Sequence, residues 1–191
     1  MAAFTFKPMG LPGLLLIEGK LFPDERGFFL EAYRESELTA AGIPPRLVQD
    51  NVSRSAKGTL RGLHYQKSPA AQGKLMRCLR GKVFDVAVDI RKGSSTYGRW
   101  EAVELSDERN MMLWIPEGFA HGFFVLSDSA DILYKTTDYF SLENDRGIRW
   151  DDPAVAVRWP STQVKLSPKD ARLPLLADAD NDFAWTPGPG P

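Results

Sequence analysis

Short apolar segments that alternate with a period of two run along most of the chain, and Gly and Pro separate them. In 82–90 the alternate positions fall on two faces, because successive side chains of a strand point to opposite sides. One face carries Phe84, Val86, Val88 and Ile90. The other carries Asp85 and Asp89, so we expect it to meet water or a polar interior. This segment is the clearest predicted strand.

The same features predict further strands, which are at 13–18, 28–33, 73–80, 100–105, 111–115, 122–126 and 130–136. Short strands at regular spacing, bounded by Gly and Pro, are typical of a sandwich, a jelly roll or a barrel. We therefore predict an all-β domain in which the helices are few and short.

Two segments have the signals of short helices. The first is 36–41, with Ser36 as the expected N-cap and Gly42 as the stop. The second begins near Ser167, a candidate N-cap that is followed by a proline and, three positions on, by Asp170. In such an arrangement the carboxylate of Asp170 can return to the backbone of its own N-cap.

The composition is that of a globular chain with one core. Of 191 residues, 43% are hydrophobic and 26% are charged, which fits a single domain. We expect that domain at 1–185 and a flexible tail at 186–191, where Pro and Gly alternate. The single cysteine, Cys78, lies among apolar residues and is predicted to be a small core residue.

The net charge and the lengths of the apolar runs indicate where in the cell the protein resides. A net charge of -1 gives no global field that would draw the protein to nucleic acid or to a membrane surface. No apolar run approaches the roughly 20 residues that cross a bilayer, and the N-terminus has no secretory signal pattern. We therefore expect a cytoplasmic protein that binds neither nucleic acid nor membrane.

Positions between 50 and 85 carry cations without an intervening acid. These cations are Arg54, Lys57, Arg61, Lys67, Lys74, Arg77, Arg80 and Lys82. Such a segment can gather an anionic ligand such as a pyrophosphate. It can equally be a row of solvated strand edges, where Lys is common. The sequence leaves both interpretations open.

Common nucleotide and metal motifs are missing. Neither G-x-G-x-x-G nor G-x-x-x-x-G-K-[ST] occurs, so no Rossmann or P-loop phosphate site is expected. The chain has two histidines, His64 and His121, so a metal site of three histidines cannot form. The segment PEGFAHG at 116–122 nevertheless resembles the second cupin motif, whereas LHY at 63–65 stands where a paired histidine motif is expected. We expect a cupin barrel with no metal.

Several ordered motifs carry a more specific resemblance. They are DERGFF at 24–29, QDN at 49–51, LRGLHYQ at 60–66, QGK at 72–74 and WIPEGFAHG at 114–122. Together they resemble the dTDP-4-dehydrorhamnose 3,5-epimerase family, and the resemblance covers about 10–176. It implies a cupin-type double-stranded β-helix, or jelly-roll barrel, that acts as a homodimer without a cofactor. The implied reaction converts dTDP-4-dehydro-6-deoxy-D-glucose into dTDP-4-dehydro-L-rhamnose.

The resemblance also assigns catalytic roles. His64 is implied as the general base, with Asp170 as the carboxylate that orients it. Tyr134 corresponds to the proton donor, and Lys74 to the cation that stabilises the enolate oxygen. These residue types suit the chemistry, since hydrogens on C3 and C5 of a 4-keto sugar are both acidic and inversion needs a base and an acid on opposite faces.

Further positions are implied to contact the dTDP-linked 4-keto-6-deoxy sugar. They are Arg26, Glu31, Gln49, Asn51, Arg61, His121, Asp145 and Lys169. Arg26 and Glu31 are expected to act in the site of the neighbouring subunit, because family members are homodimers joined through an N-terminal strand. No residue is implied as a metal ligand.

Two departures from the family leave the outcome of the reaction open. Asp145 stands where Glu is common, and Phe140 where Tyr is common. A monofunctional 3- or 5-epimerase of an antibiotic-sugar pathway is therefore an alternative. A non-catalytic nucleotide-sugar binding module is a second alternative, although binding alone would need no acid and base. A metal-dependent cupin oxygenase is disfavoured by the two-histidine count.

Overall fold

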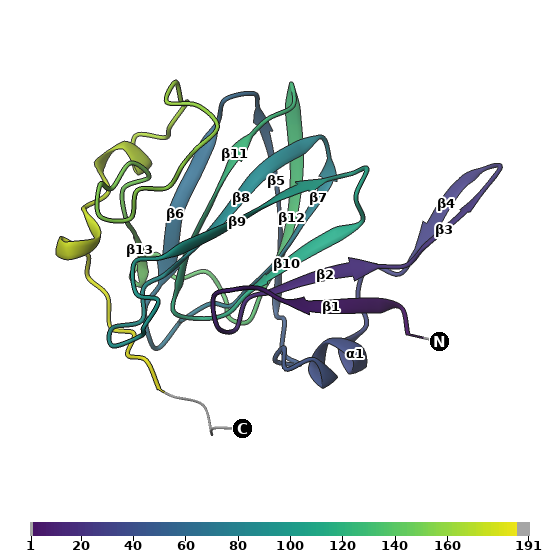
Figure 1. Ribbon diagram of the computed structural model, residues 1–191, viewed down its shortest axis with the longest axis horizontal. Helices are drawn as coiled ribbons and strands as arrows, with labels where there is room; N and C mark the ends of the chain where they lie inside the picture. The colour runs from purple at the N-terminus through teal and green to yellow at the C-terminus, as the bar shows by residue number, and fades with distance from the viewer. Residues whose placement is uncertain (1, 187–191) are drawn as a thin grey trace.

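Two antiparallel β-sheets packed face to face make up the body of the protein (Figure 1). The computed structural model describes residues 2–186. The six-stranded sheet has the order β1-β2-β10-β7-β12-β5 and consists of β1 (Phe4–Pro8), β2 (Leu15–Gly19), β5 (Gln49–Ala56), β7 (Lys74–Arg80), β10 (Met111–Ile115) and β12 (Ser129–Thr136). The five-stranded sheet has the order β13-β6-β11-β8-β9 and consists of β6 (Leu60–Gln66), β8 (Lys82–Asp89), β9 (Trp100–Ser106), β11 (Phe119–Val125) and β13 (Asp145–Gly147). The predicted all-β fold is confirmed.

The main core lies between the two sheets. It is built by alternate side chains of both sheets, among them Met76, Cys78, Leu113, Val83 and Phe123. Cys78 is buried there, as predicted. The acid-bearing face of β8 also points into this space, with Asp85 fully buried, so the expected polar interior is found.

Each sheet is covered on its outer face as well. The apolar face of β8 packs under the C-terminal segment, whose short helices are η1 (Asp170–Arg172) and η2 (Leu176–Asp178). On the other side, α1 (Glu35–Ala40) places Leu38 against the outer face of the six-stranded sheet. β8 is therefore apolar toward the C-terminal segment and partly polar toward the space between the sheets.

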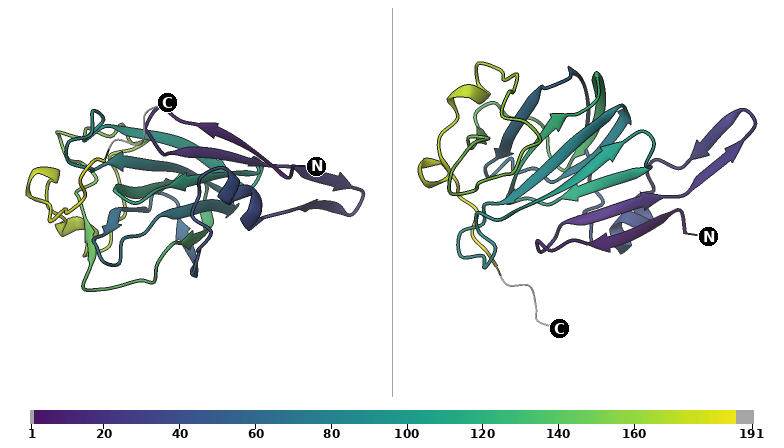
Figure 2. Two further views of the ribbon diagram at one scale, coloured as in Figure 1. Left: turned by 90° about the horizontal axis from the view of Figure 1, so that it is seen from below. Right: turned by 45° about the horizontal axis from the view of Figure 1, so that its top comes forward.

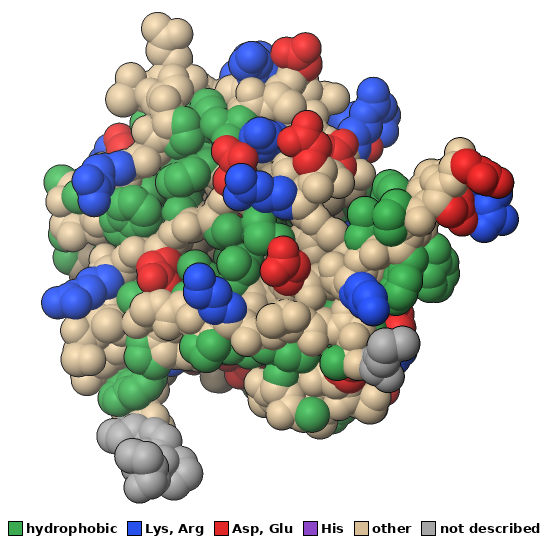
Figure 3. Space-filling view, turned by 45° about the vertical axis from the view of Figure 1, so that its right-hand side comes forward, with side chains coloured by type: hydrophobic (Ala, Val, Ile, Leu, Met, Phe, Trp, Pro, Cys, Tyr) green, Lys and Arg blue, Asp and Glu red, His purple; other side chains and the backbone are tan. Residues whose placement is uncertain are grey.

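A two-stranded hairpin, β3 (Leu21–Asp24) and β4 (Gly27–Leu30), projects from the body as an arm (Figures 1 and 2). Its large apolar side chains are exposed, and they are Leu21, Phe22, Phe28 and Phe29. Figure 3 shows these apolar surfaces on the arm, with charged side chains at its tip. Exposed aromatic side chains on an isolated hairpin are typical of a surface that another chain covers.

Several predicted boundaries need correction. The strand expected at 28–33 ends at Leu30, and β1, β3, β5, β6 and β13 were not predicted as strands. The first helix begins at Glu35 after Arg34, so Ser36 is not its N-cap, while Gly42 does end it with a positive φ of 89°. The second helical signal yields one 3₁₀ turn, in which Ser167 Oγ accepts a hydrogen bond from the Asp170 N–H. The predicted tail lies outside the described residues, apart from Thr186.

Candidate active site

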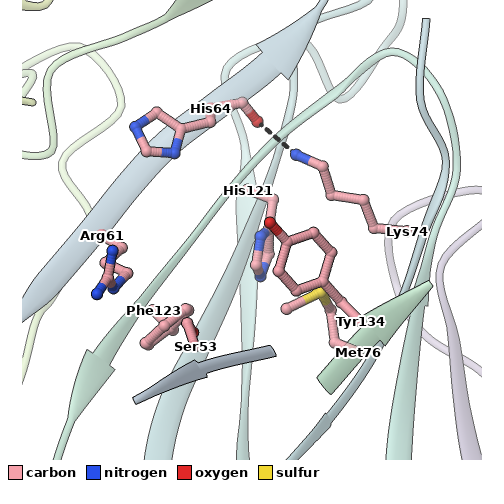
Figure 4. Close-up of a pocket in the computed structure, with 8 residues that line it drawn as sticks. All are labelled: Ser53, Arg61, His64, Lys74, Met76, His121, Phe123 and Tyr134. Atoms are coloured by element: carbon pink, nitrogen blue, oxygen red, sulfur yellow. Dashed lines mark hydrogen bonds between the residues drawn. The ribbon is translucent and has the colours of Figure 1, made fainter. Parts of the chain in front are cut away.

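A cavity of about 220 Å³ lies between the two sheets. Polar residues make up most of its lining, which consists of Ser53, Arg61, His64, Lys74, Met76, His121, Phe123 and Tyr134 (Figure 4). This volume is below the roughly 300–1,000 Å³ of sites that enclose a whole drug-sized ligand. The cavity therefore suits one portion of a larger ligand.

A close approach of two backbones places the two histidines opposite each other. His64 on β6 pairs with His121 on β11, next to an irregularity in the ladder. At Gly62, a Cβ atom would lie 2.5 Å from the Cα of Gly122, and its φ of 135° is unfavourable for other residues. Glycine at this point lets β6 approach β11 and carry His64 to the cavity.

His64 forms a dyad with Asp170. Its Nε2 lies 2.6 Å from Oδ1 of Asp170, whose side chain is only 4% exposed, against 30% for His64. Burial raises the pKa of Asp170, but the hydrogen bonds with His64 and Ser167 outweigh it and leave the pKa below its ordinary value. An ionised carboxylate can only accept, so a neutral His64 donates from Nε2 and keeps a lone pair on Nδ1.

Lys74 brings a buried ammonium group to the same cavity. Its Nζ donates to the backbone carbonyl of His64 at 3.2 Å (Figure 4). Burial lowers its pKa to about 8. At neutral pH the group is still largely protonated, so it can stabilise a developing oxyanion.

Tyr134 lies on β12, from the opposite sheet to His64. Its hydroxyl points into the cavity, toward the side that His64 occupies (Figure 4). Burial raises its pKa, an effect that exceeds the opposing influence of Arg61. The phenol is therefore held in its protonated form and is suited to donate a proton.

His121 is held by Asp85, a carboxylate that was not predicted as a site residue. Its Nε2 lies 2.8 Å from Oδ1 of Asp85, and both side chains are buried. Ser53, Met76 and Phe123 are also lining residues that were not predicted. Strand alternation could have found Met76 and Phe123, because Met76 lies two positions from Lys74 and Phe123 two from His121.

A second hollow of about 430 Å³ shares His64 and Arg61 with the cavity. Lys165, Lys169 and Ser167 also line it, so three cations surround it. Arg61 Nε donates to Ser55 Oγ at 2.9 Å, which orients the guanidinium. Cations in this arrangement suit a diphosphate.

The basic segment between 50 and 85 is dispersed rather than gathered. Arg61 and Lys74 line the cavity, but other members form ion pairs elsewhere: Arg54 with Asp131, Lys57 with Asp128, Lys67 with Asp180 and Lys82 with Glu104. The interpretation of the whole segment as one anion site is therefore wrong. Arg54 and Arg80 are exposed on strands and Lys57 is exposed in a turn, so surface positions account for part of it.

The remaining predicted binding residues fall into two groups. Gln49, Asn51, Asp145 and Lys169 lie on the body of the protein, whereas Arg26 and Glu31 lie on the arm or just after it. Gln49 Nε2 donates to Asn51 Oδ1 at 2.8 Å on β5, and Lys169 pairs with Asp145. Arg26 lies on the projecting arm, where it pairs with Asp24. Glu31, just after the arm, pairs with Arg34. Neither Arg26 nor Glu31 lines the cavity of its own chain.

Residues 2–186 contain no cluster of metal-ligand side chains and no helix suited to span a membrane. No three His, Cys, Asp or Glu side chains of this part lie together as metal ligands would. No helix in this part is both long and apolar enough to cross a membrane.

Comparison with known proteins connects this site to one family. The sequence profile described as dTDP-4-dehydrorhamnose 3,5-epimerase matches residues 8–178. The dTDP-4-dehydrorhamnose 3,5-epimerase of Shigella flexneri is 53% identical over 171 residues, which is 89% of this chain and 94% of the relative. The dTDP-4-dehydrorhamnose 3-epimerase of Streptomyces niveus is 39% identical, over 91% of this chain and 84% of its own.

Solved structures agree with the sequence relatives. The crystal structure of dTDP-6-deoxy-D-glucose-3,5-epimerase from Legionella pneumophila Philadelphia 1, in complex with dTDP-4-keto-L-rhamnose, superposes with a TM-score of 0.88. It is 52% identical and covers 91% of this chain and 93% of its own. The expected cupin-type fold is thereby confirmed.

Proposed function

The chain belongs to the dTDP-4-dehydrorhamnose 3,5-epimerase family, and from that premise we propose that His64 and Tyr134 are the base and the acid of its reaction. The enzyme converts dTDP-4-dehydro-6-deoxy-D-glucose into dTDP-4-dehydro-L-rhamnose by inversion at C3 and C5. The observation that carries the assignment is the cavity that His64, Lys74 and Tyr134 line together.

Each inversion is a proton exchange through an enolate. The lone pair on Nδ1 of His64 takes the hydrogen from the carbon next to the ketone, and the electron pair of the C–H bond moves onto the ketone oxygen. Tyr134 then returns a proton to the same carbon from the opposite face. The substrate neither gains nor loses electrons, and solvent restores both side chains to their starting states.

Lys74 and the Asp170 carboxylate compensate the charges that develop during these proton transfers. The ammonium of Lys74 stabilises the enolate oxygen, and removal of such a donor typically costs on the order of 10²–10³ in rate. Asp170 stabilises the imidazolium that forms on His64. His121, held by Asp85, adds a polar contact to the sugar.

The rest of the ligand lies outside the cavity. Arg61 and Lys169 bind the diphosphate in the adjoining hollow, where their charges meet those of the ligand. Gln49 and Asn51 on β5 contact the nucleoside. The Asp145–Lys169 pair fixes the Lys169 ammonium at the edge of this region.

The protein acts as a cytoplasmic homodimer in which the arm of each subunit packs on the other. The exposed apolar side chains of the arm support this arrangement. Arg26 and Glu31 then reach the site of the neighbouring subunit, which accounts for their distance from the cavity of their own chain.

Deuterium exchange tests the assignment. With enzyme and substrate in D₂O, deuterium is expected at both C3 and C5 of the product. Label at neither carbon, despite tight binding, would leave a nucleotide-sugar binding module as the better description. Label at one carbon would indicate a monofunctional enzyme, an outcome of interest because a 3-epimerase of Streptomyces niveus is 39% identical.

A further inference from the structure

The loop between β12 and β13, residues 137–144, carries exposed apolar side chains near the site. Tyr139, Phe140 and Leu142 are each more than half exposed, although they lie in one short segment. No Lys or Arg occurs in this loop. Its surface therefore suits an aromatic or apolar portion of a ligand rather than a phosphate.

One buried amide holds this loop in place. Gln66 is 3% exposed, and its Nε2 donates to the carbonyl oxygens of Ala70 at 2.6 Å and Tyr139 at 3.1 Å. Its Oε1 accepts from the N–H of Ser141 at 2.7 Å. Both the nitrogen and the oxygen of the Gln66 carboxamide are thus hydrogen-bonded. Two of its three bonds are made with Tyr139 and Ser141, the residues that flank Phe140.

A second amide binds the loop from the other sheet. Gln49 Oε1 accepts from the N–H of Phe140 at 2.9 Å. Gln49 belongs to β5 and Gln66 to β6, so the backbone around Phe140 is held between the two sheets. Phe140 is therefore fixed relative to both strands that form this edge of the site.

The spacing along β5 places Phe140 at a distance from the cavity that a nucleotide-linked sugar can span. Ser53 lines the cavity, and Gln49 lies four positions earlier on the same face of β5. At about 3.3 Å per residue, Gln49 is roughly 13 Å from Ser53. A ligand whose sugar fills the cavity can therefore extend its nucleoside along β5 toward Phe140.

We infer that Gln66 is a positioning residue for nucleobase recognition, because it fixes the loop that presents Phe140 beside Gln49. The inference rests on the proposed function, which supplies a nucleotide-linked substrate. Gln66 itself touches no reacting atom. Its effect is on affinity for the base, through Phe140, and not on proton transfer at His64.

A comparison of two ligands tests this role. Binding of dTDP and of inorganic pyrophosphate is measured by calorimetry for the wild type and for Gln66→Met, which keeps the length of the side chain but makes none of the three hydrogen bonds. We expect the Kd for dTDP to rise about tenfold, because loss of the three hydrogen bonds frees the loop and Phe140 to leave the position that binds the base. The Kd for pyrophosphate is expected to change less than twofold. In turnover, KM rises by a similar factor while kcat stays within about twofold.

Asn181→Leu is the matched control. Asn181 is also a buried amide that makes backbone hydrogen bonds, with Ile90 and Phe183, but it lies in the C-terminal segment and not at the β12–β13 loop. It is expected to lower stability without changing the affinity for dTDP. Equal effects of the two variants on dTDP, or an equal loss of dTDP and pyrophosphate binding by Gln66→Met, would overturn the inference.

Phe140→Ala supplies a readout that does not depend on a buried substitution. Phe140 is exposed, so this variant folds, and it is expected to weaken dTDP binding about tenfold.

Gln66→Glu, which keeps the acceptor for Ser141, replaces Gln66→Met if the latter does not fold. Added to Phe140→Ala, either substitution should cost little more, because both act through one contact. Additive losses would contradict the inference, whereas a wild type that does not bind dTDP would overturn the proposed function together with it.

Discussion

Asp170 follows His64 by 106 positions in the chain, yet its Oδ1 lies 2.6 Å from Nε2 of His64. The segment before Asp170 is attached to the start of β6, where the N–H of Leu60 donates to the carbonyl of Lys165. The N–H of Asp170 then donates to Ser167 Oγ, which turns the carboxylate toward β6. The dyad therefore depends on the docking of the C-terminal segment against the strand that carries His64.

Asp170→Asn is expected to lower kcat by on the order of 10²–10⁴-fold with a small change in KM. A carboxamide cannot stabilise an imidazolium, and its NH₂ group favours the tautomer in which Nδ1 is protonated and cannot act as a base. Steady-state kinetics check this. Asp151→Asn, which removes an exposed partner of Arg149, is the control. Near wild-type turnover by Asp170→Asn would contradict the role of the dyad.

Strand alternation predicted the fold where one face of a strand was apolar. The strand at 111–115 matches β10 residue for residue, and 82–90 matches β8 to within one position. β5 was missed because its cavity-facing positions are polar and include Asn51, Ser53 and Ser55. A strand that lines a polar site lacks the apolar alternation on which the prediction depends.

The site was predictable mainly through the resemblance, because its members meet only in three dimensions. Asp170 illustrates this, since its local sequence favours a helix cap, whereas its side chain contacts His64 instead. Asp85 carried a usable signal, because an acid on an otherwise apolar strand face needs a partner. That partner, His121, lies on β11, 36 positions away, and single-sequence reasoning gives no register between two strands.

The pH profile of kcat/KM is expected to fall as pH rises through about 8. The buried Lys74 has its pKa lowered to about 8, so its ammonium group is lost above that pH and the enolate oxygen loses its cation. Lys74→Arg is a useful comparison, because guanidinium keeps its charge. Its rate will be lower, but its falling limb should move to higher pH. A falling limb that stays in place in this variant would assign it to another group.

Lys74→Met is expected to be inactive but more stable at pH 7 than the wild type, by a few kcal/mol at most. The folded-state pKa of about 8 is below the ordinary 10.5, so the folded protein binds fewer protons than the unfolded chain between these values. The contribution of Lys74 to the stability of the wild type therefore rises with pH between about 8 and 10.5. The difference in stability between Lys74→Met and the wild type shrinks over the same range. Urea unfolding at pH 7 and pH 10 measures the difference. A constant difference would show that burial of this charge is not what costs stability.

Tyr134→Phe is expected to separate proton removal from inversion. The base still takes the proton and the enolate still forms, so solvent deuterium can enter the substrate from the His64 side with retention of configuration. Epimerised product should fall on the order of 10²-fold or more. NMR in D₂O distinguishes exchange from inversion. Tyr97→Phe, at a partly exposed position, is the control. Loss of exchange and inversion to the same extent would argue against Tyr134 as the acid.

The arm provides a test of the dimer and of the shared site together. Phe29 is 69% exposed in the single chain, so Phe29→Asp should give a monomer by sedimentation, whereas Tyr97→Asp should not. Arg26→Ala and His64→Asn are each expected to be nearly inactive alone.

When these two variants are mixed and allowed to exchange subunits, each mixed dimer has one site with an intact His64 from one chain and an intact Arg26 from the other. Half of the dimers are then mixed and half of their sites are complete, so about a quarter of wild-type activity should return. If Arg26 instead served its own chain, both sites of a mixed dimer would lack one residue and the mixture would stay inactive. Recovery of activity therefore distinguishes a site completed by the arm of the neighbouring subunit from one built by a single chain.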